Sequence, residues 1–305
     1  MDFNLLKTLC QIQATSGDES VIKQFLIDYV NKASSNWATK PQIIKGEGFQ
    51  DNVMLIFGQP KLAYYAHIDT VGFTTRYQNQ LITIGSPDVS EADQLVGKDE
   101  LGFIECTITI DKNGNAFHNF KRPIIPGTPL VYKPNFSVAQ ETITSPYLDN
   151  RLGIFALLKL AETLENGVLV FSTYEEHGGG SAGYLASYLH NQHQISQSLI
   201  VDVTWVTEGI QLGYGPVVSL RDAYIPRKKF VNKITSLLEE SSLVYQKEVE
   251  ASGGSDGSEI QRSSLPIDWC FVGVAVNNPH AANEKANIFD IIRLVELLKT
   301  LSNHI

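Results

Sequence analysis

Short apolar segments that alternate with helical patterns restrict this chain to an α/β fold. Residues 52–57 and 62–66 are apolar runs edged by Gly, Pro or Asp, which is typical of buried strands. Apolar residues at helical spacing over residues 21–30 predict a helix before these strands. After residue 146 the alternation resumes. The pattern there predicts strands at 168–171, 198–201 and 272–276 and helices at 153–164, 182–189 and 288–297. We therefore predict an α/β/α sandwich built on a mixed sheet.

Between residues 73 and 145 the helical period disappears. Short β-rich runs at 81–84, 103–110 and 130–132 are separated by turn sequences such as the one at 112–115. We expect two domains: residues 1–72 and 146–305 form the α/β/α domain, and residues 73–145 form an inserted small all-β domain. The insertion would act as a lid or as an assembly surface.

Composition excludes several classes of protein. Hydrophobic residues make up 43% of the 305 residues and charged residues 19%, which excludes a disordered chain. The formal net charge is −9 and no dense cluster of Lys and Arg occurs, so we expect no nucleic-acid partner. No apolar run of about 18 residues could span a membrane, and the N-terminal residues do not resemble a secretory signal, so we expect a cytoplasmic protein without a membrane partner.

The three cysteines, Cys10, Cys106 and Cys270, are far apart and odd in number. That spacing offers neither a disulfide framework nor a pair of metal-binding thiolates. We expect each to be a small buried apolar residue.

Polar residues follow the predicted core strands at the points where the strands end. They are His67 and Asp69, Glu175 and Glu176, Asp202, and His280. Ligand sites of open α/β sheets lie beyond the carboxyl ends of the strands, so these side chains should meet. Asp149, at the head of a predicted helix, should join them.

So many carboxylates in one cleft would repel one another unless cations compensate them. Two divalent ions bring four positive charges, which balance Asp149, Glu176, Asp202 and an ionised Glu175. The residues therefore favour a binuclear site with nitrogen and oxygen ligands, as suits zinc, cobalt or manganese.

Simpler interpretations exist for several of these residues. Asp149 could cap the following helix, the pair Glu175 and Glu176 could be solvated, and Ser255 and Asp256 could be turn residues rather than substrate-binding ones. A serine esterase is a further alternative, because residues 177–180 resemble an oxyanion loop and residues 253–257 fit the G-x-S-x-G pattern. That reading would need Asp268 and His280, which lie on one short strand–loop unit, to complete a triad with Ser255.

Five short segments and one His, in this order, resemble the motif series of the M42 metallo-aminopeptidases, a glutamyl aminopeptidase and endoglucanase-like family related to the M20 and M28 peptidases. They are residues 66–73, 148–153, 175–176, 201–204 and 253–256, and His280. Each motif alone is weak, but their order and their places after predicted strands make the resemblance specific. It covers nearly the whole chain, including the β insertion.

The resemblance implies a role for each residue. Asp149 would bridge two metal ions, most simply Zn²⁺, with Co²⁺ and Mn²⁺ as alternatives. The remaining ligands would be Glu176 and His280 on one ion and His67 and Asp202 on the other. Glu175 would be the general base, and Asp69 would orient His67. The residues alone do not tell which of the two glutamates binds metal.

The resemblance implies that the protein is a metallopeptidase, specifically an aminopeptidase that cleaves the N-terminal bond of a peptide. It also implies that the protein forms a homo-oligomer. An M20-like carboxypeptidase or an N-acyl amino acid deacylase could use the same two metals. A binding protein that has kept a peptidase fold is the alternative from another class, but such a relic should lack a ligand or the base. The sequence retains all of them.

Overall fold

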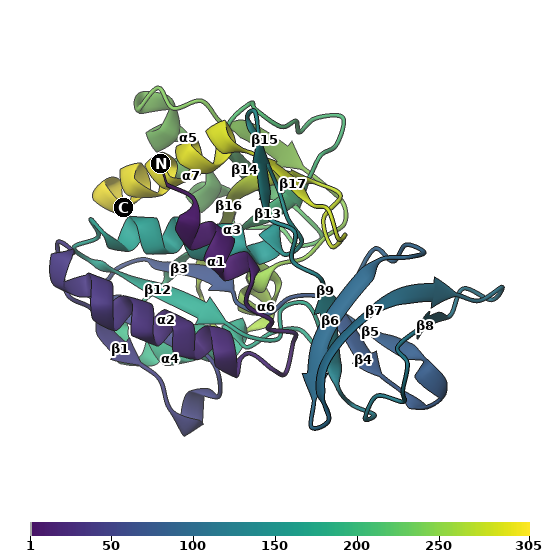
Figure 1. Ribbon diagram of the computed structural model, residues 1–305. Coiled ribbons are helices and arrows are strands. Elements are labelled where there is room, and N and C mark those ends of the chain that lie inside the picture. The colour runs from purple at the N-terminus through teal and green to yellow at the C-terminus, as the bar shows by residue number, and fades with distance from the viewer. Residues whose placement is uncertain (1) are drawn as a thin grey trace.

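The computed structural model describes residues 2–305, and two sheets organise it (Figure 1). The larger sheet has eleven strands. They are β1 (Gln42–Ile44), β2 (Val53–Phe57), β3 (Ala63–His67), β10 (Ser137–Ala139), β11 (Thr142–Thr144), β12 (Gly167–Ser172), β13 (Gln197–Trp205), β14 (Val217–Arg221), β15 (Gln246–Val249), β16 (Asp268–Asn277) and β17 (Lys285–Asn287). Its central strands β12, β3, β13 and β16 are parallel to one another, whereas β2 runs antiparallel to β12 and β14 runs antiparallel to β16, so the sheet is mixed.

Alternate residues of the central strands point to opposite faces of the large sheet. In β2, Val53, Leu55 and Phe57 join the larger apolar core, and Met54 and Ile56 join the core on the other face. Both faces are therefore covered, which explains why the strands read as continuous apolar runs.

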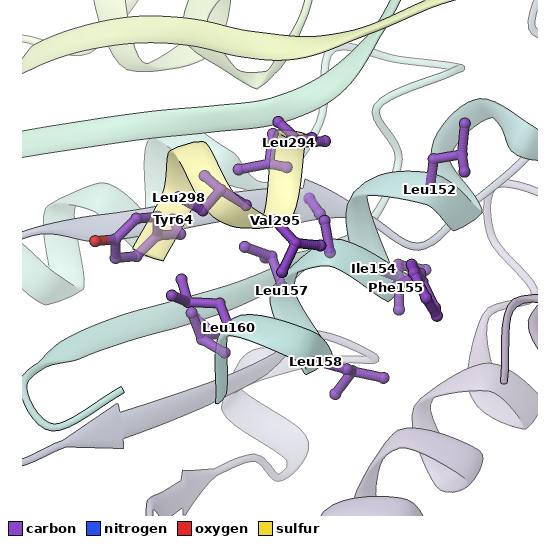
Figure 2. Packing of buried hydrophobic residues seen from close by; sticks show 14 of the residues in the cluster. Tyr64, Leu152, Ile154, Phe155, Leu157, Leu158, Leu160, Leu294, Val295 and Leu298 are labelled. Atoms are coloured by element: carbon purple, nitrogen blue, oxygen red, sulfur yellow. The ribbon is translucent and has the colours of Figure 1, made fainter. Parts of the chain in front are cut away.

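Helices cover the two faces of the large sheet. The larger core contains residues of α1 (Asn4–Cys10), α2 (Ser20–Ala33), α3 (Leu148–Ala161), α5 (Lys228–Glu240) and α7 (Ile288–His304). The other core contains residues of α4 (Ala182–His193) and α6 (Asp256–Arg262). Figure 2 shows Leu294, Val295 and Leu298 of α7 packed beside α3. The fold is the predicted α/β/α sandwich, so the prediction of the fold class is confirmed.

A smaller antiparallel sheet forms a separate lobe with its own apolar core (Figure 1). Its six strands are β4 (Gly72–Thr75), β5 (Leu81–Ile84), β6 (Gln94–Asp99), β7 (Gly102–Ile110), β8 (Ala116–His118) and β9 (Pro129–Tyr132). Strands β10 and β11 pair through β17 with the large sheet. The division into domains at residues 72 and 146 stays a prediction, although hydrogen bonding assigns residues 137–144 to the large sheet.

Several elements were not predicted from the sequence. They are the helices α1, α5 and α6, the paired strands β14 and β15, and three 3₁₀ turns, Ser34–Asn36, Glu47–Phe49 and Tyr77–Asn79. The short strands β1, β4, β6, β8, β10, β11 and β17 were not predicted either. The three cysteines are free and buried, as expected. No helix in the part of the chain that the structure describes is long and apolar enough to cross a membrane.

Candidate metal centre and active site

The parallel strands bring the predicted polar residues to one edge of the large sheet. His67 is the last residue of β3 and is in register with Ser172, the last residue of β12. The loop after β12 carries Glu175 and Glu176, and Asp202 lies within β13. This common direction follows from the parallel pairing, because parallel strands end at the same edge of a sheet.

Asp149 lies between two imidazole rings. Its Oδ1 atom is 3.1 Å from Nε2 of His67, and its Oδ2 atom is 3.2 Å from Nε2 of His280. Each imidazole also faces a second carboxylate: His67 Nε2 lies 3.5 Å from Oδ1 of Asp202, and His280 Nε2 lies 3.3 Å from Oε2 of Glu176. The cluster thus consists of two histidine–carboxylate pairs that share Asp149.

The donor atoms of this cluster suit a metal ion. One donor atom each from His67, Asp149 and Glu176 lies within 4.8 Å of the others. The Oε1 atom of Glu176 is buried and has no hydrogen-bond partner among residues 2–305. A buried carboxylate oxygen without a donor is costly unless a cation lies beside it. Imidazole nitrogens and carboxylate oxygens are a ligand set that divalent transition metals accept, so the residues fit such an ion.

The protonation of the cluster reflects its excess of negative charge. Burial by itself would lower the pKa of His67, but Asp202, Asp149 and Asp69 raise it well above its ordinary value. Burial by itself would also lower the pKa of His280, but Asp149, Glu176 and Glu284 raise it to about 10. Both imidazoles therefore attract protons, which shows how strongly this cluster favours positive charge.

The carboxylates respond to burial in different ways. Burial raises the pKa of Glu176 to about 8 and that of Glu175 well above its usual range. Burial also raises the pKa of Asp202. For Asp149 the hydrogen bonds and charges of His280 and His67 outweigh burial, and its pKa falls far below 3.8. Asp149 is therefore the most acidic carboxylate of the cluster.

Asp69 organises the loop that carries the two glutamates. Its carboxylate accepts hydrogen bonds from the backbone N–H of Glu175 at 3.1 Å and of Glu176 at 3.0 Å, and from the Ser16 hydroxyl at 2.6 Å. The Nδ1 atom of His67 lies 3.1 Å from the backbone oxygen of Asp69 and 3.6 Å from its Oδ1 atom. Asp69 therefore contacts both His67 and the backbone of the glutamate pair.

Glu284 is a site residue that the sequence analysis did not assign. It is 1% exposed, and its carboxylate accepts hydrogen bonds from the backbone N–H groups of Asp149 and His280, each at 3.0 Å. Nothing in the local pattern distinguishes it from a solvated Glu. It lies four residues after His280, the only residue of this loop that the sequence analysis named.

Arg151 supports the site from behind rather than facing the cavity. It is fully buried, and its guanidinium donates to the carbonyl oxygens of Leu9, Ile12 and Ile68. The neighbouring Asn150 donates to the Val201 oxygen and accepts from the N–H of Gly153. These hydrogen bonds fix the start of α3 against the end of β3 and the middle of β13.

Ser255 and Asp256 lie at the start of α6. The Ser255 hydroxyl accepts from the N–H of Gly257 and caps the helix, and Asp256 accepts a hydrogen bond from the Ser172 hydroxyl. The second oxygen of Asp256, Oδ1, is buried without a partner in the described chain. Both residues line a cavity of about 200 Å³ that also contains Glu175, so their role in substrate binding stays a prediction.

The geometry argues against the serine esterase alternative. Asp268 is the first residue of β16, and His280 lies three residues after the last. A ten-residue strand separates them by roughly 30 Å at about 3.3 Å per residue. Ser255, Asp268 and His280 therefore cannot form one hydrogen-bonded triad.

A cavity of about 380 Å³ opens on the candidate metal cluster. Its walls include His67, Asp149, Glu175, Glu176, Asp202 and His280, and further residues from 203–205, from 248–254, and Ser86, Asp222 and Phe271. The structure thus gathers every predicted metal ligand and the predicted base on one cavity, of a size that suits a small ligand.

Comparison with known proteins agrees with this arrangement. Residues 98–297 match the family described as M42 glutamyl aminopeptidase. The chain is 24% identical over 301 residues to a protein of Escherichia coli strain K12 named "Putative aminopeptidase FrvX", covering 84% of this chain and 82% of that protein. The match to the family covers about two thirds of the chain.

Solved structures show the same fold. The aminopeptidase APDkam598 from the archaeon Desulfurococcus kamchatkensis has a TM-score of 0.87 at 20% identity, covering 99% of this chain and 94% of the other. The structure described as PhTET1-12s, a dodecamer in the asymmetric unit, has a TM-score of 0.85 at 20% identity, covering 100% of both chains.

An α/β/α sandwich with a cluster of histidines and carboxylates at the ends of its parallel strands defines a hydrolase of the metallopeptidase type. The chain belongs to the M42 family of aminopeptidases and is a peptidase. Membership of this metallopeptidase family implies divalent metal ions. The predictions of the family and of an enzyme are confirmed.

Proposed function

We propose that this protein is a dinuclear metal-dependent aminopeptidase that hydrolyses the N-terminal bond of peptides. In this proposal Asp149 serves two ions, His67 and Asp202 complete one ligand set, and Glu176 and His280 complete the other. The observation that carries it is the position of Asp149, whose two oxygens lie 3.1 Å and 3.2 Å from two different imidazoles.

Two divalent ions, most simply Zn²⁺, with Co²⁺ and Mn²⁺ as alternatives, would supply Lewis-acid polarisation of the scissile carbonyl and activation of water. Glu175 would act as the general base. Its side chain lines the cavity, and its backbone N–H donates to the Asp69 carboxylate. Glu175 would take a proton from the attacking water. As the C–N bond breaks, the same carboxyl would return that proton to the departing amine.

Asp69 would position both His67 and the loop of the two glutamates, for the contacts described above support both. We propose that Ser255 and Asp256, which line the adjoining cavity, bind substrate. The Oδ1 atom of Asp256, which has no partner in the described chain, supports this role. A free N-terminal amine, which is cationic when protonated, suits a cavity so rich in carboxylates.

The test compares three substrates with the metal-loaded enzyme: leucine 4-nitroanilide, its N-acetylated form, and N-acetyl-leucine. We expect turnover of the unblocked anilide alone. Faster hydrolysis of N-acetyl-leucine would instead support the deacylase alternative, because that substrate presents a free carboxylate, for which a cleft needs a cationic or amide anchor. No turnover of any of the three would favour the non-catalytic alternative.

We further propose that the protein forms a homo-oligomer and acts in the cytoplasm. The structural neighbour described as a dodecamer supports assembly, and the β insertion offers a separate lobe for it. Light scattering on the eluate of a size-exclusion column measures the mass directly. A mass of one chain, 33.8 kDa, at micromolar concentration would contradict the assembly.

A further inference from the structure

Carboxylates beyond the metal cluster line the same cavity. Seven carboxylates belong to its walls in all, and four of them, Asp149, Glu175, Glu176 and Asp202, are already assigned to the metal ions and the base. The other three are Asp222, Glu248 and Glu250. No Lys or Arg of residues 2–305 lines the cavity. Two divalent ions balance the first four charges, so the remaining three leave a surplus of negative charge.

Glu248 forms a buried part of the wall. It lies on β15 and is 3% exposed. Its carboxylate accepts a hydrogen bond from the Thr204 hydroxyl, and no residue of the described chain forms an ion pair with it. Burial raises the pKa of Glu248 and the hydroxyls of Thr204 and Ser219 oppose that rise, so nearby positive charge would be favourable.

The neighbouring charges do not neutralise Glu248. Lys247 points to the opposite side of β15, where its Nζ atom lies 2.8 Å from the Glu239 carboxylate. Burial raises the pKa of Asp222, and Arg221, which donates to the backbone oxygen of Asp222, opposes that rise, so Arg221 acts on Asp222 rather than on Glu248.

The position of Glu248 relative to the metal cluster follows from β13. Asp202 and Thr204 are two residues apart on this strand, so their side chains share one face about 7 Å apart. Glu248 contacts Thr204. The four-carbon stem of a lysine can span such a distance.

The wall of the cavity at Glu248 is buried, so the part of the substrate that contacts it must end there. The peptide after the scissile bond must continue toward solvent, whereas the side chain of the first residue has no continuation. The structure assigns Glu248, supported by Glu250 and Asp222, as the group that selects a cationic side chain, Lys or Arg, on the N-terminal residue of the substrate. This assignment rests on the proposed aminopeptidase function and names the substrate class of that same site.

The test measures kcat/KM of the metal-loaded enzyme for the 4-nitroanilides of lysine, arginine, norleucine, leucine and glutamate. Lysine and norleucine have side chains of similar length and differ in charge. We expect the lysine and arginine substrates to exceed norleucine and leucine by about tenfold or more, and glutamate to be the poorest. Equal or faster turnover of norleucine or glutamate, with measurable aminopeptidase activity, would overturn the assignment and leave the proposed function intact.

Variants test whether Glu248 is the source of the preference for lysine over norleucine. Glu248→Gln should reduce the ratio of lysine to norleucine kcat/KM by about tenfold or more. The matched control is Glu239→Gln, which removes a carboxylate from the other side of β15 and should leave that ratio unchanged. If Glu248→Gln fails to fold, Glu250→Gln should lower the ratio in the same direction. An unchanged ratio in a folded Glu248→Gln enzyme would contradict the role of Glu248. Absence of activity on every unblocked substrate would refute the proposed function itself.

Discussion

Backbone amides hold the buried carboxylates around the candidate site. Asp69 accepts from the N–H groups of Glu175 and Glu176, and Glu284 accepts from those of Asp149 and His280. A backbone N–H group is rigidly placed, so a carboxylate oxygen that accepts from it is held in position without a donor from another side chain. These contacts therefore orient the residues on which the proposed metal chemistry depends.

The first prediction separates the two adjacent glutamates. Glu175→Gln keeps the size of the side chain and removes the proton acceptor, so the variant should keep its metal and lose on the order of 10²-fold or more in kcat. Glu176→Gln should instead lose metal, because its Oε2 atom lies 3.3 Å from His280 in the cluster. Metal analysis and kinetics of both variants check this. The reverse pattern would show that the two roles are exchanged.

The second prediction concerns Glu284. A Gln at this position keeps one acceptor oxygen and replaces the other by an NH₂ group, which cannot accept from the N–H of both Asp149 and His280. We expect metal affinity to fall by about 10- to 100-fold, as for other residues that orient ligands. Competition with a coloured chelator measures it. Glu296→Gln, at a half-exposed ion pair on α7, is the control and should bind metal normally.

At the scale of elements, the small sheet owes part of its order to one ion pair. Asp99, the last residue of β6, has a side chain that is 1% exposed and receives both terminal nitrogens of Arg122, each at 2.7 Å. Leu101 adds a backbone N–H at 2.9 Å. The pair joins the end of β6 to the segment that leads into β9.

This pair predicts a pH dependence. The hydrogen bonds from Arg122 hold the pKa of Asp99 at about 2, below its ordinary value of 3.8. Because the folded pKa is the lower one, the stabilisation is present above pH 3.8 and is lost as the pH falls towards about 2. Asp99→Asn should therefore lower the Tm at pH 7, and the difference from the parent should shrink through this range.

Thermal unfolding of parent and variant between pH 7 and pH 2 measures that difference. The control is Glu105→Gln, which breaks the exposed pair with Lys133 and should shift the Tm little at any pH. A Tm difference for Asp99→Asn that stays constant down to pH 2 would show that the carboxylate charge is not its source.

At the scale of the whole molecule, the active cavity depends on both ends of the chain and on the insertion. His67 precedes the small sheet, Asp149 follows it, and His280 comes from the segment before α7. The Ser86 hydroxyl, on the small lobe, lies 3.1 Å from Nδ1 of His280. The lobe thus contributes directly to the wall of the cavity.

The whole-molecule prediction is metal dependence. Removal of divalent ions with a chelator should abolish peptidase activity, and added Zn²⁺, Co²⁺ or Mn²⁺ should restore it.

Ser255→Ala should keep measurable activity, because the Ser255 hydroxyl caps α6 and is not the nucleophile. Loss of the cap should lower the stability of the protein by about 1 kcal/mol. An inactive Ser255→Ala protein that still binds metal, together with covalent labelling of Ser255 by a phosphonate in the parent, would support serine chemistry.

Several parts of the fold could be read from the chain because they depend on local periodicity. The apolar runs of β2, β3, β12, β13 and β16 are buried on both faces, and the helical spacing of α2, α4 and α7 follows from one buried stripe on each helix. The segment between residues 206 and 267 was left unassigned. Its α5 does carry a helical stripe, Phe230, Val231, Ile234 and Leu238. The strands β14 and β15 contain polar and charged residues and so lack the continuous apolar run by which the central strands were recognised.

The sequence by itself determined the α/β alternation, the β insertion and the set of histidines and carboxylates that follow the core strands. Only the tertiary structure decided which atoms meet: the contacts of Asp149 with two imidazoles and the hydrogen bond from the backbone of Glu175 to Asp69. It also decided that Glu284 and Glu248 are buried. The physical reason is that periodicity reports which face of an element is buried. Contacts between residues such as Asp149 and His280, which are 131 positions apart, depend on strand order and register instead.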